Sequence, residues 1–175
     1  IEGWDINAAT ANGIEIRNTT AYFIIRNIAV HDGKPNNHGG IRLQNVANGI
    51  IMNTNSTSNV YLASLTKVSN TKVQNNTALD DGVISLEESN HNIIAFNYLY
   101  SPSRPYPEPA SSIGIGGDYN DVIGNTLINF GNGIGVSGNF NNIRNNKVSN
   151  GQWYAIILSL GGQNSVIGNE VSGGV

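Results

Sequence analysis

The chain has 175 residues, of which 12% are charged, and its formal net charge is −3. Nine Lys and Arg residues spread along the sequence cannot form the basic surface that nucleic acid requires, so no nucleic-acid partner is expected. No apolar run is long enough to span a bilayer, and the absence of Cys excludes disulfides and thiolate metal sites.

In chain order, short β-branched segments with an apolar-x-x-Asn-x-apolar pattern recur about every 21 to 28 residues. Such a unit is too short for a helical-hairpin repeat and indicates one coil of a β-solenoid. Ile1–Ile6 fits the same frame, with Trp4 at the Asn position. The other segments begin at Ile24, Met52, Val73, Ile94, Val122, Ile143 and Val166.

A second strand is expected after each of these segments, because apolar residues flank a central residue with a period of two. This alternation places the flanking residues in the core and the central residue on the outer face. The outward column then reads Glu15, Arg42, Ser64, Ser85, Gly114, Gly135 and Ile157.

The recurrent Asn residues predict a ladder in which each side-chain amide bonds to the next coil, because buried turns must satisfy their polar groups. Asn53 is an alternative to Asn55 in this series. The expected ladder residues are Asn27, Asn55, Asn76, Asn97, Asn125, Asn146 and Asn169.

Together these patterns predict an all-β fold, a single-stranded right-handed parallel β-helix of about seven coils with 21–28 residues per coil. We expect one domain over residues 1–175 that is a piece of a longer solenoid or of a multidomain extracellular protein. Exposed strands at both ends predict end-to-end or lateral self-association.

The cadence of Gly82–Leu86 followed by Asn92–Asn97 resembles the repeats of the pectate-lyase-like superfamily. It is most similar to the repeats of NosD-type periplasmic proteins and of carbohydrate-binding or sugar-hydrolysing β-helix domains. The resemblance implies this fold, a polysaccharide or glycan partner, and an extracellular, cell-surface or periplasmic location. The outward column contains no Asp, which departs from the lyase pattern, and the NosD-type copper association does not transfer to a chain without Cys and with one Met.

Two insertions, residues 31–40 and 101–112, interrupt the repeat at the same point of coils three units apart. Insertions of a solenoid often form its binding face, so we expect a glycan groove between them, floored by small residues of the outward column. The expected substrate-binding residues are His31, Asp32, Lys34, His38, Arg42, Arg104, Tyr106, Glu108, Trp153 and Tyr154.

Asp80 and Asp81 lie at the rim of this groove and have two interpretations. They could act as the general acid and base of a glycoside hydrolase, or as calcium ligands in a polysaccharide lyase. Alternatively, Asp-Asp-Gly is an ordinary turn. His31 and His38 with Asp32 could bind a metal or be solvated loop residues.

Two functions therefore remain open. The first is an extracellular carbohydrate-directed module that binds or processes a polysaccharide, and the second is a non-catalytic structural module of a cell-surface or secreted assembly. A repeat domain of a NosD-type periplasmic protein is a further alternative at the level of the family.

Overall fold

The computed structural model describes residues 1–80, 83–101 and 111–174, and strands dominate its secondary structure. A short 3-10 turn, η1 (Lys34–Asn36), lies in the first insertion. Within the described ranges, no helix is long and apolar enough to cross a membrane.

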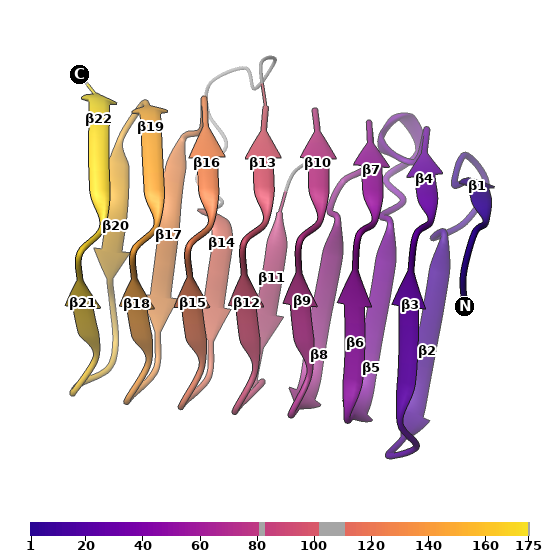
Figure 1. The fold of residues 1–175 in the computed structure, drawn as a ribbon, viewed down its shortest axis with the longest axis horizontal. Helices are drawn as coiled ribbons and strands as arrows, with labels where there is room; N and C mark the ends of the chain where they lie inside the picture. Colours follow the sequence, from indigo (N-terminus) through magenta and orange to yellow (C-terminus); the bar gives the residue numbers. More distant parts are fainter. Residues whose placement is uncertain (81–82, 102–110, 175) are drawn as a thin grey trace.

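The strands form three parallel sheets that run the length of the molecule (Figure 1). Sheet 1 consists of β1 (Asp5–Asn7), β4 (Ala29–His31), β7 (Asn55–Thr57), β10 (Thr77–Leu79), β13 (Tyr98–Tyr100), β16 (Thr126–Ile128), β19 (Lys147–Gly151) and β22 (Glu170–Gly174). Sheet 2 consists of β2 (Ile14–Thr19), β5 (Ile41–Ala47), β8 (Ala63–Ser69), β11 (Ile84–Glu87), β14 (Ser111–Gly116), β17 (Asn132–Ser137) and β20 (Tyr154–Leu158). Sheet 3 consists of β3 (Phe23–Arg26), β6 (Gly49–Met52), β9 (Lys72–Gln74), β12 (Ile93–Ala95), β15 (Asp121–Ile123), β18 (Asn142–Arg144) and β21 (Ser165–Ile167).

The chain visits sheets 1, 2 and 3 in turn and then returns to sheet 1 one strand further along the axis (Figure 1). Right-handed connections are the rule for parallel strands of one sheet. The fold is a right-handed parallel β-solenoid of about seven coils, as the sequence predicts.

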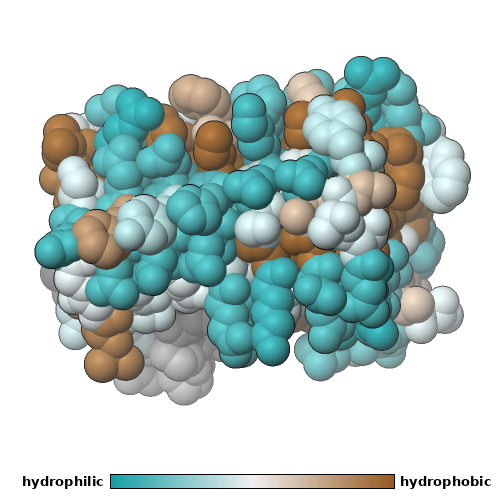
Figure 2. All heavy atoms as spheres, turned by 90° about the horizontal axis from the view of Figure 1, so that it is seen from below, coloured by the Kyte–Doolittle hydropathy of each residue, from teal (hydrophilic) through white to brown (hydrophobic). Residues whose placement is uncertain are grey.

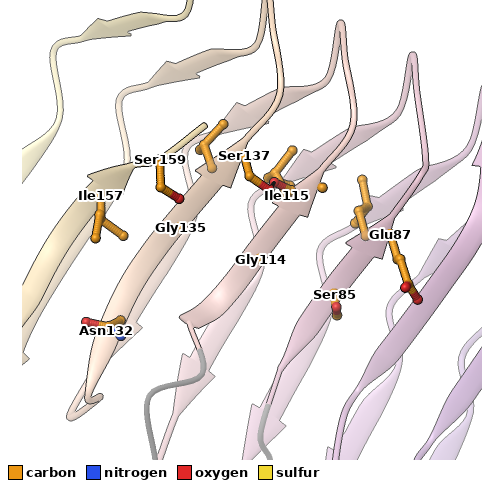
Figure 3. Close-up of a pocket in the computed structure, with 12 residues that line it drawn as sticks. Ser85, Glu87, Gly114, Ile115, Asn132, Gly135, Ser137, Ile157 and Ser159 are labelled. Carbon is orange, nitrogen blue, oxygen red and sulfur yellow. Dashed lines mark hydrogen bonds between the residues drawn. The ribbon is translucent and has the colours of Figure 1, made fainter. Parts of the chain in front are cut away.

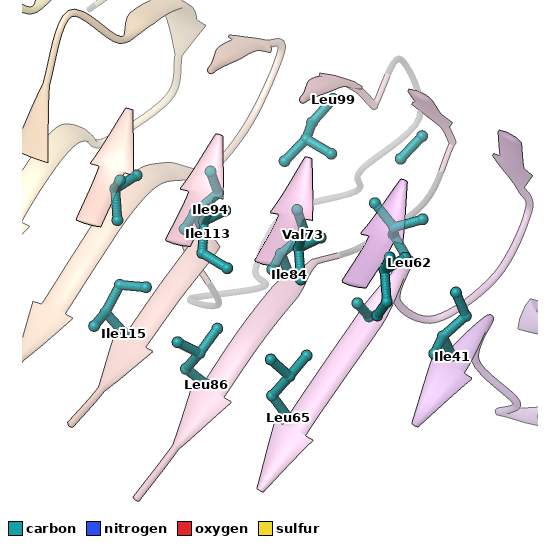
Figure 4. Close-up of a cluster of buried hydrophobic side chains, with 14 of the residues drawn as sticks. Ile41, Leu62, Leu65, Val73, Ile84, Leu86, Ile94, Leu99, Ile113 and Ile115 are labelled. Atoms are coloured by element: carbon teal, nitrogen blue, oxygen red, sulfur yellow. The ribbon is translucent and has the colours of Figure 1, made fainter. Parts of the chain in front are cut away.

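The core forms because each strand turns alternate residues inward. In sheet 2, Ile41 and Leu43 are fully buried while Arg42 between them faces outward. Equivalent residues of successive coils stack on one another, and Figure 4 shows their side chains filling the interior between the sheets. The strand register confirms the whole predicted outward column, from Glu15 paired with Arg42 to Gly135 paired with Ile157.

An asparagine ladder runs through the turn between sheets 3 and 1. The Asn76 side-chain amide donates to Oδ1 of Asn97 at 2.9 Å, and Asn97 donates to Oδ1 of Asn125 at the same distance. Asn146 and Asn169 continue this series. The ladder prediction is therefore confirmed for these coils.

The ladder assignments of Asn27 and Asn55 are wrong by one position. Strand register aligns Asn76 with buried Thr54, and Thr54 with buried Ile28. Asn27 and Asn55 are exposed, as is Asn53. The reason is that Asn27 and Asn53 occupy the preceding turn position, where φ is 52° and Asn is favoured for its tolerance of left-handed backbone.

A second ladder, which the sequence argument missed, runs through the turn between sheets 2 and 3. Asn92 donates to Oδ1 of Asn120 at 3.2 Å, Asn120 donates to Asn141, and Asn141 donates to Asn164. Each of these residues precedes a residue of the first ladder by five positions. The two ladders hold successive coils in register at two of the three corners.

Candidate functional site

Both insertions connect sheet 1 to sheet 2, as predicted. The first lies between β4 and β5 and the second between β13 and β14, three coils further along sheet 1. Asp81 lies outside the described residues, and so do three residues of the second insertion, Arg104, Tyr106 and Glu108.

In the first insertion, His31 lies between two carboxylates. Its Nδ1 is 2.8 Å from Oδ2 of Asp32, and its Nε2 is 3.2 Å from Oδ1 of Asp5. The hydrogen bond with Asp32 is the main cause that raises the pKa of His31 above its usual 6.5, and the charges of both carboxylates add to it. The protonated imidazole, which donates from both nitrogens, is therefore favoured in the folded chain.

Lys34 joins the first insertion to Asp80. Its Nζ lies 3.2 Å from Oδ1 of Asp80 and donates to the Asp80 carbonyl at the same distance. Asp80 has a φ of 57°, the conformation that the equivalent turn residues Asp32 and Ser58 also adopt. Asp80 thus has a turn position and an ion-pair partner, which favours the turn interpretation of this residue over a catalytic one.

The remaining predicted residues do not gather around Asp80. His38 Nδ1 lies 3.0 Å from the carbonyl oxygen of Ala8, and Arg42 Nε lies 3.6 Å from Oε1 of Glu15, so both face the N-terminal coil. Trp153 and Tyr154 are exposed near the opposite end, beside and in β20.

A hollow of about 510 Å³ lies on the outer face of sheet 2, across β11, β14, β17 and β20 (Figure 3). We call it the trough. Its floor contains the outward column residues Ser85, Gly114 and Gly135, and Ile157 closes the column at the C-terminal end. Four strands at the usual spacing extend over about 14 Å along the axis. No residue of the first insertion lines it, and the hollow extends from β11, which lies between the two insertions, past the second insertion to β20.

Polar groups line the trough beside this floor. A parallel row contains Glu87, Gly116, Ser137 and Ser159, and Asn132 lies at the edge where β17 begins (Figure 3). Strand register places Tyr154 next to Asn132 on the following coil. Hydroxyl and carboxylate groups therefore lie beside a floor whose two central residues, Gly114 and Gly135, have no side chains.

Gly114 is the residue that gives the trough its open floor. A Cβ built on it would have no atom of another described residue within 4 Å, and its φ is not in the left-handed region. Neither packing nor backbone conformation therefore requires glycine there. A glycine in a strand interior weakens the strand, and one reason to find it is that a ligand approaches the backbone closely.

Comparison with protein-family models, with curated proteins and with solved structures gives no match. The structure alone therefore shows the solenoid fold, and membership of the pectate-lyase-like superfamily stays a prediction.

The described residues contain no cluster of three or more His, Asp or Glu side chains arranged to hold a metal ion. The calcium site predicted at Asp80 and Asp81 includes a residue outside the described ranges and stays untested. The trough itself has one carboxylate among its described lining residues, Glu87.

The sequence argument named Ser85, Gly114 and Gly135 as column residues but missed Glu87, Asn132 and the serine row. Each predicted strand was read as three residues, two inward with one outward between them, as in Ile84–Leu86 and Ile134–Val136. Glu87 and Ser137 are the next residues after these two triplets. Extending each triplet by one outward residue would have found both.

Proposed function

We propose that this chain is an extracellular carbohydrate-binding β-solenoid module that holds a polysaccharide along the trough of sheet 2. The observation that carries the proposal is the open glycine floor at Gly114, in a strand where glycine has a cost and no structural cause. An extended ligand can lie on this floor along the axis and contact the backbone of successive coils.

The chemistry of the lining supports a sugar ligand. Ser85, Ser137 and Ser159 offer hydroxyl groups that both donate and accept, and Glu87 accepts from hydroxyls. Sugar hydroxyls match this mixture, and the volume of the hollow is within the range of small-molecule sites.

Binding is a better proposal than hydrolysis. Glycoside hydrolysis uses two carboxyl groups on either side of the scissile bond. Among the described lining residues, only Glu87 has a carboxylate, and Asp80 pairs with Lys34 outside the trough. Lyase activity of the kind that the resemblance implies also lacks support here, because no Lys or Arg lines the described part of the trough.

The test is the substitution Gly114→Val. The Cβ of this valine meets no other described residue, so we expect the fold to be retained and stabilised by about 0.5–1 kcal/mol through the better strand propensity of valine. The same side chain projects from the floor into the trough and blocks close approach to the backbone, so glycan binding should be lost. The measurements are a glycan array, followed by calorimetric titration of each glycan that binds, and urea unfolding. Gln74→Val, on the outward face of β9 in sheet 3, is the control and should leave binding unchanged.

Unchanged glycan binding by a folded Gly114→Val variant would move the site away from the trough. If the unmodified chain binds no glycan, the carbohydrate proposal fails. The alternative is then the non-catalytic structural module, for which the two Asn ladders provide a rigid axis.

A further inference from the structure

In the turn between sheets 2 and 3, the residue directly before the position of the second ladder has a left-handed backbone in six successive coils. The φ angles of these residues are between 51° and 63°. Asn, which tolerates this conformation, occupies the first two positions, but bulky rings occupy the next three. In chain order the residues are Asn48, Asn70, His91, Tyr119, Phe140 and Gln163.

The three rings form a continuous stack along the axis. The ring centroids of His91 and Tyr119 are 5.0 Å apart at 7°, and those of Tyr119 and Phe140 are 4.8 Å apart at 4°. The planes of stacked rings in van der Waals contact are about 3.5 Å apart. The longer centroid distances here mean that neighbouring rings are displaced sideways, which leaves part of each ring face uncovered.

The stack leaves apolar surface in water. Tyr119 is 50% exposed and Phe140 is 46% exposed, on a face that is otherwise largely hydrophilic (Figure 2). Asn at the same two positions would satisfy the turn without exposing a ring, as Asn48 and Asn70 do. Stacking of neighbouring rings offsets part of the backbone cost, but the uncovered faces need a further explanation.

The turns that carry the stack lie beside a hollow that adjoins the trough. A second hollow, of about 450 Å³, shares Glu87, Gly116 and Ser137 with the trough and continues around the corner of the coil to Asp118. Asp118 directly precedes Tyr119. Its Oδ1 accepts two hydrogen bonds from Asn139, the residue before Phe140. A ligand that leaves the trough over this corner arrives at the rings.

The charges along this path are negative. Glu87, Glu88 and Asp118 line the corner hollow, and none of the described residues of either hollow is Lys, Arg or His. The nearby Lys67 is paired with Glu88, with 3.5 Å between Nζ and Oε2. Carboxylates accept hydrogen bonds from hydroxyls and repel the carboxylates of polyuronates.

We infer that the ring stack of His91, Tyr119 and Phe140 is a second subsite for the polysaccharide, and that this polysaccharide is uncharged. The chain crosses the corner at Gly116 and Asp118 and places the apolar C–H faces of its sugar rings on Tyr119 and Phe140. This inference rests on the proposed function and adds to it the class of the ligand and a second contact surface.

The test is calorimetric titration with neutral hexasaccharides (cellohexaose, xylohexaose and mannohexaose) and with hexagalacturonate. The variant is the double substitution Tyr119→Asn and Phe140→Asn, because Asn already occupies this turn position at 48 and 70. We expect affinity for the best neutral hexasaccharide to fall at least about tenfold, because both ring contacts are lost. Hexagalacturonate should bind the unmodified chain at least about tenfold more weakly than that neutral sugar.

The control is Phe96→Asn. Phe96 is also an exposed aromatic residue at a positive φ, but it lies in the turn between sheets 3 and 1, so its replacement should leave affinity unchanged. A readout that needs no variant is the NMR signals of the Tyr119 and Phe140 rings, which should shift when the neutral hexasaccharide is added.

The outcomes separate the two proposals. Loss of binding in Gly114→Val without any effect of the double variant, and without ring shifts, would overturn the ring subsite and leave the trough in place. Equal or tighter binding of hexagalacturonate would overturn the uncharged ligand. If none of these glycans binds the unmodified chain, and no array glycan binds it either, both proposals fail.

Discussion

At the residue scale, the high Asn content has two separate causes. Turn positions with a left-handed backbone favour Asn, as at Asn53 and Asn75, where φ is 52° and 54°. The position after each of these turn residues is buried, and there Asn bonds to the next coil, as Asn76 does. Neighbouring Asn residues can therefore have different roles, and only strand register separates them.

The charge state of His31 gives the prediction that belongs to this scale. Its pKa is raised above 6.5, mainly by the hydrogen bond with Asp32, so protonated His31 stabilises the folded state. This contribution is complete below pH 6.5 and is lost as the pH rises through the folded pKa. It is small because the side chain is partly exposed. In an NMR titration, Asp32→Asn should lower the pKa of His31, and an unchanged value would contradict the assigned cause.

At the scale of the element, the corners are held by ladder amides and the sheets by stacked apolar columns. Asn97 donates to the carbonyl of Val73 and to Asn125, and its Oδ1 accepts from the backbone and the side chain of Asn76. All of these groups are buried. One side chain therefore satisfies polar groups of both neighbouring coils.

Asn97→Ala should accordingly be among the costly substitutions. The substitution leaves the amide of Asn76 and the carbonyl of Val73 buried without this hydrogen-bond partner, and each such group costs about 1–3 kcal/mol. We therefore expect the free energy of unfolding, measured with urea, to fall by about 3 kcal/mol. The matched control is Asn55→Ala, because Asn55 is exposed in β7 and should change stability by less than about 0.5 kcal/mol. Equal losses for both variants would contradict the corrected ladder.

At the scale of the whole molecule, the sheets pair each coil only with its neighbours along the axis. The first insertion reaches one coil further, through the contact of Lys34 with Asp80. The coil of β20, β21 and β22 has one neighbour in this chain, and its apolar residues are correspondingly exposed. Leu158, Val166 and Val171 are 47%, 43% and 58% exposed, whereas Val136, Ile143 and Val148 at the same positions of the preceding coil are buried.

Hydrogen exchange should therefore differ along the axis. We expect amides of β21 and β22 to exchange faster than those of β12 and β13, which have coils on both sides. Exchange followed by mass spectrometry of peptides from the two regions measures this difference. Uniform protection would show that this chain unfolds as a single cooperative unit, or that a second molecule covers the end.

Much of the site was predictable only as separate parts. The outward column was predicted correctly, including Gly114, because in-out alternation is a local property of the strand. The pairing of Lys34 with Asp80 joins side chains two coils apart, and no sequence spacing specifies such a contact. Tyr119 and Phe140 are one repeat of 21 residues apart, but the contact between their rings depends on the geometry of the turn.

The sequence by itself determined the solenoid, its period and its buried columns, because a repeat of apolar residues with period two can bury its surface only by stacking on copies of itself. Tertiary structure decided which Asn of each coil enters the ladder, because that choice depends on register across coils. It also decided where the outer face is hollow, since a trough requires small side chains to coincide on several adjacent strands with larger ones beside them.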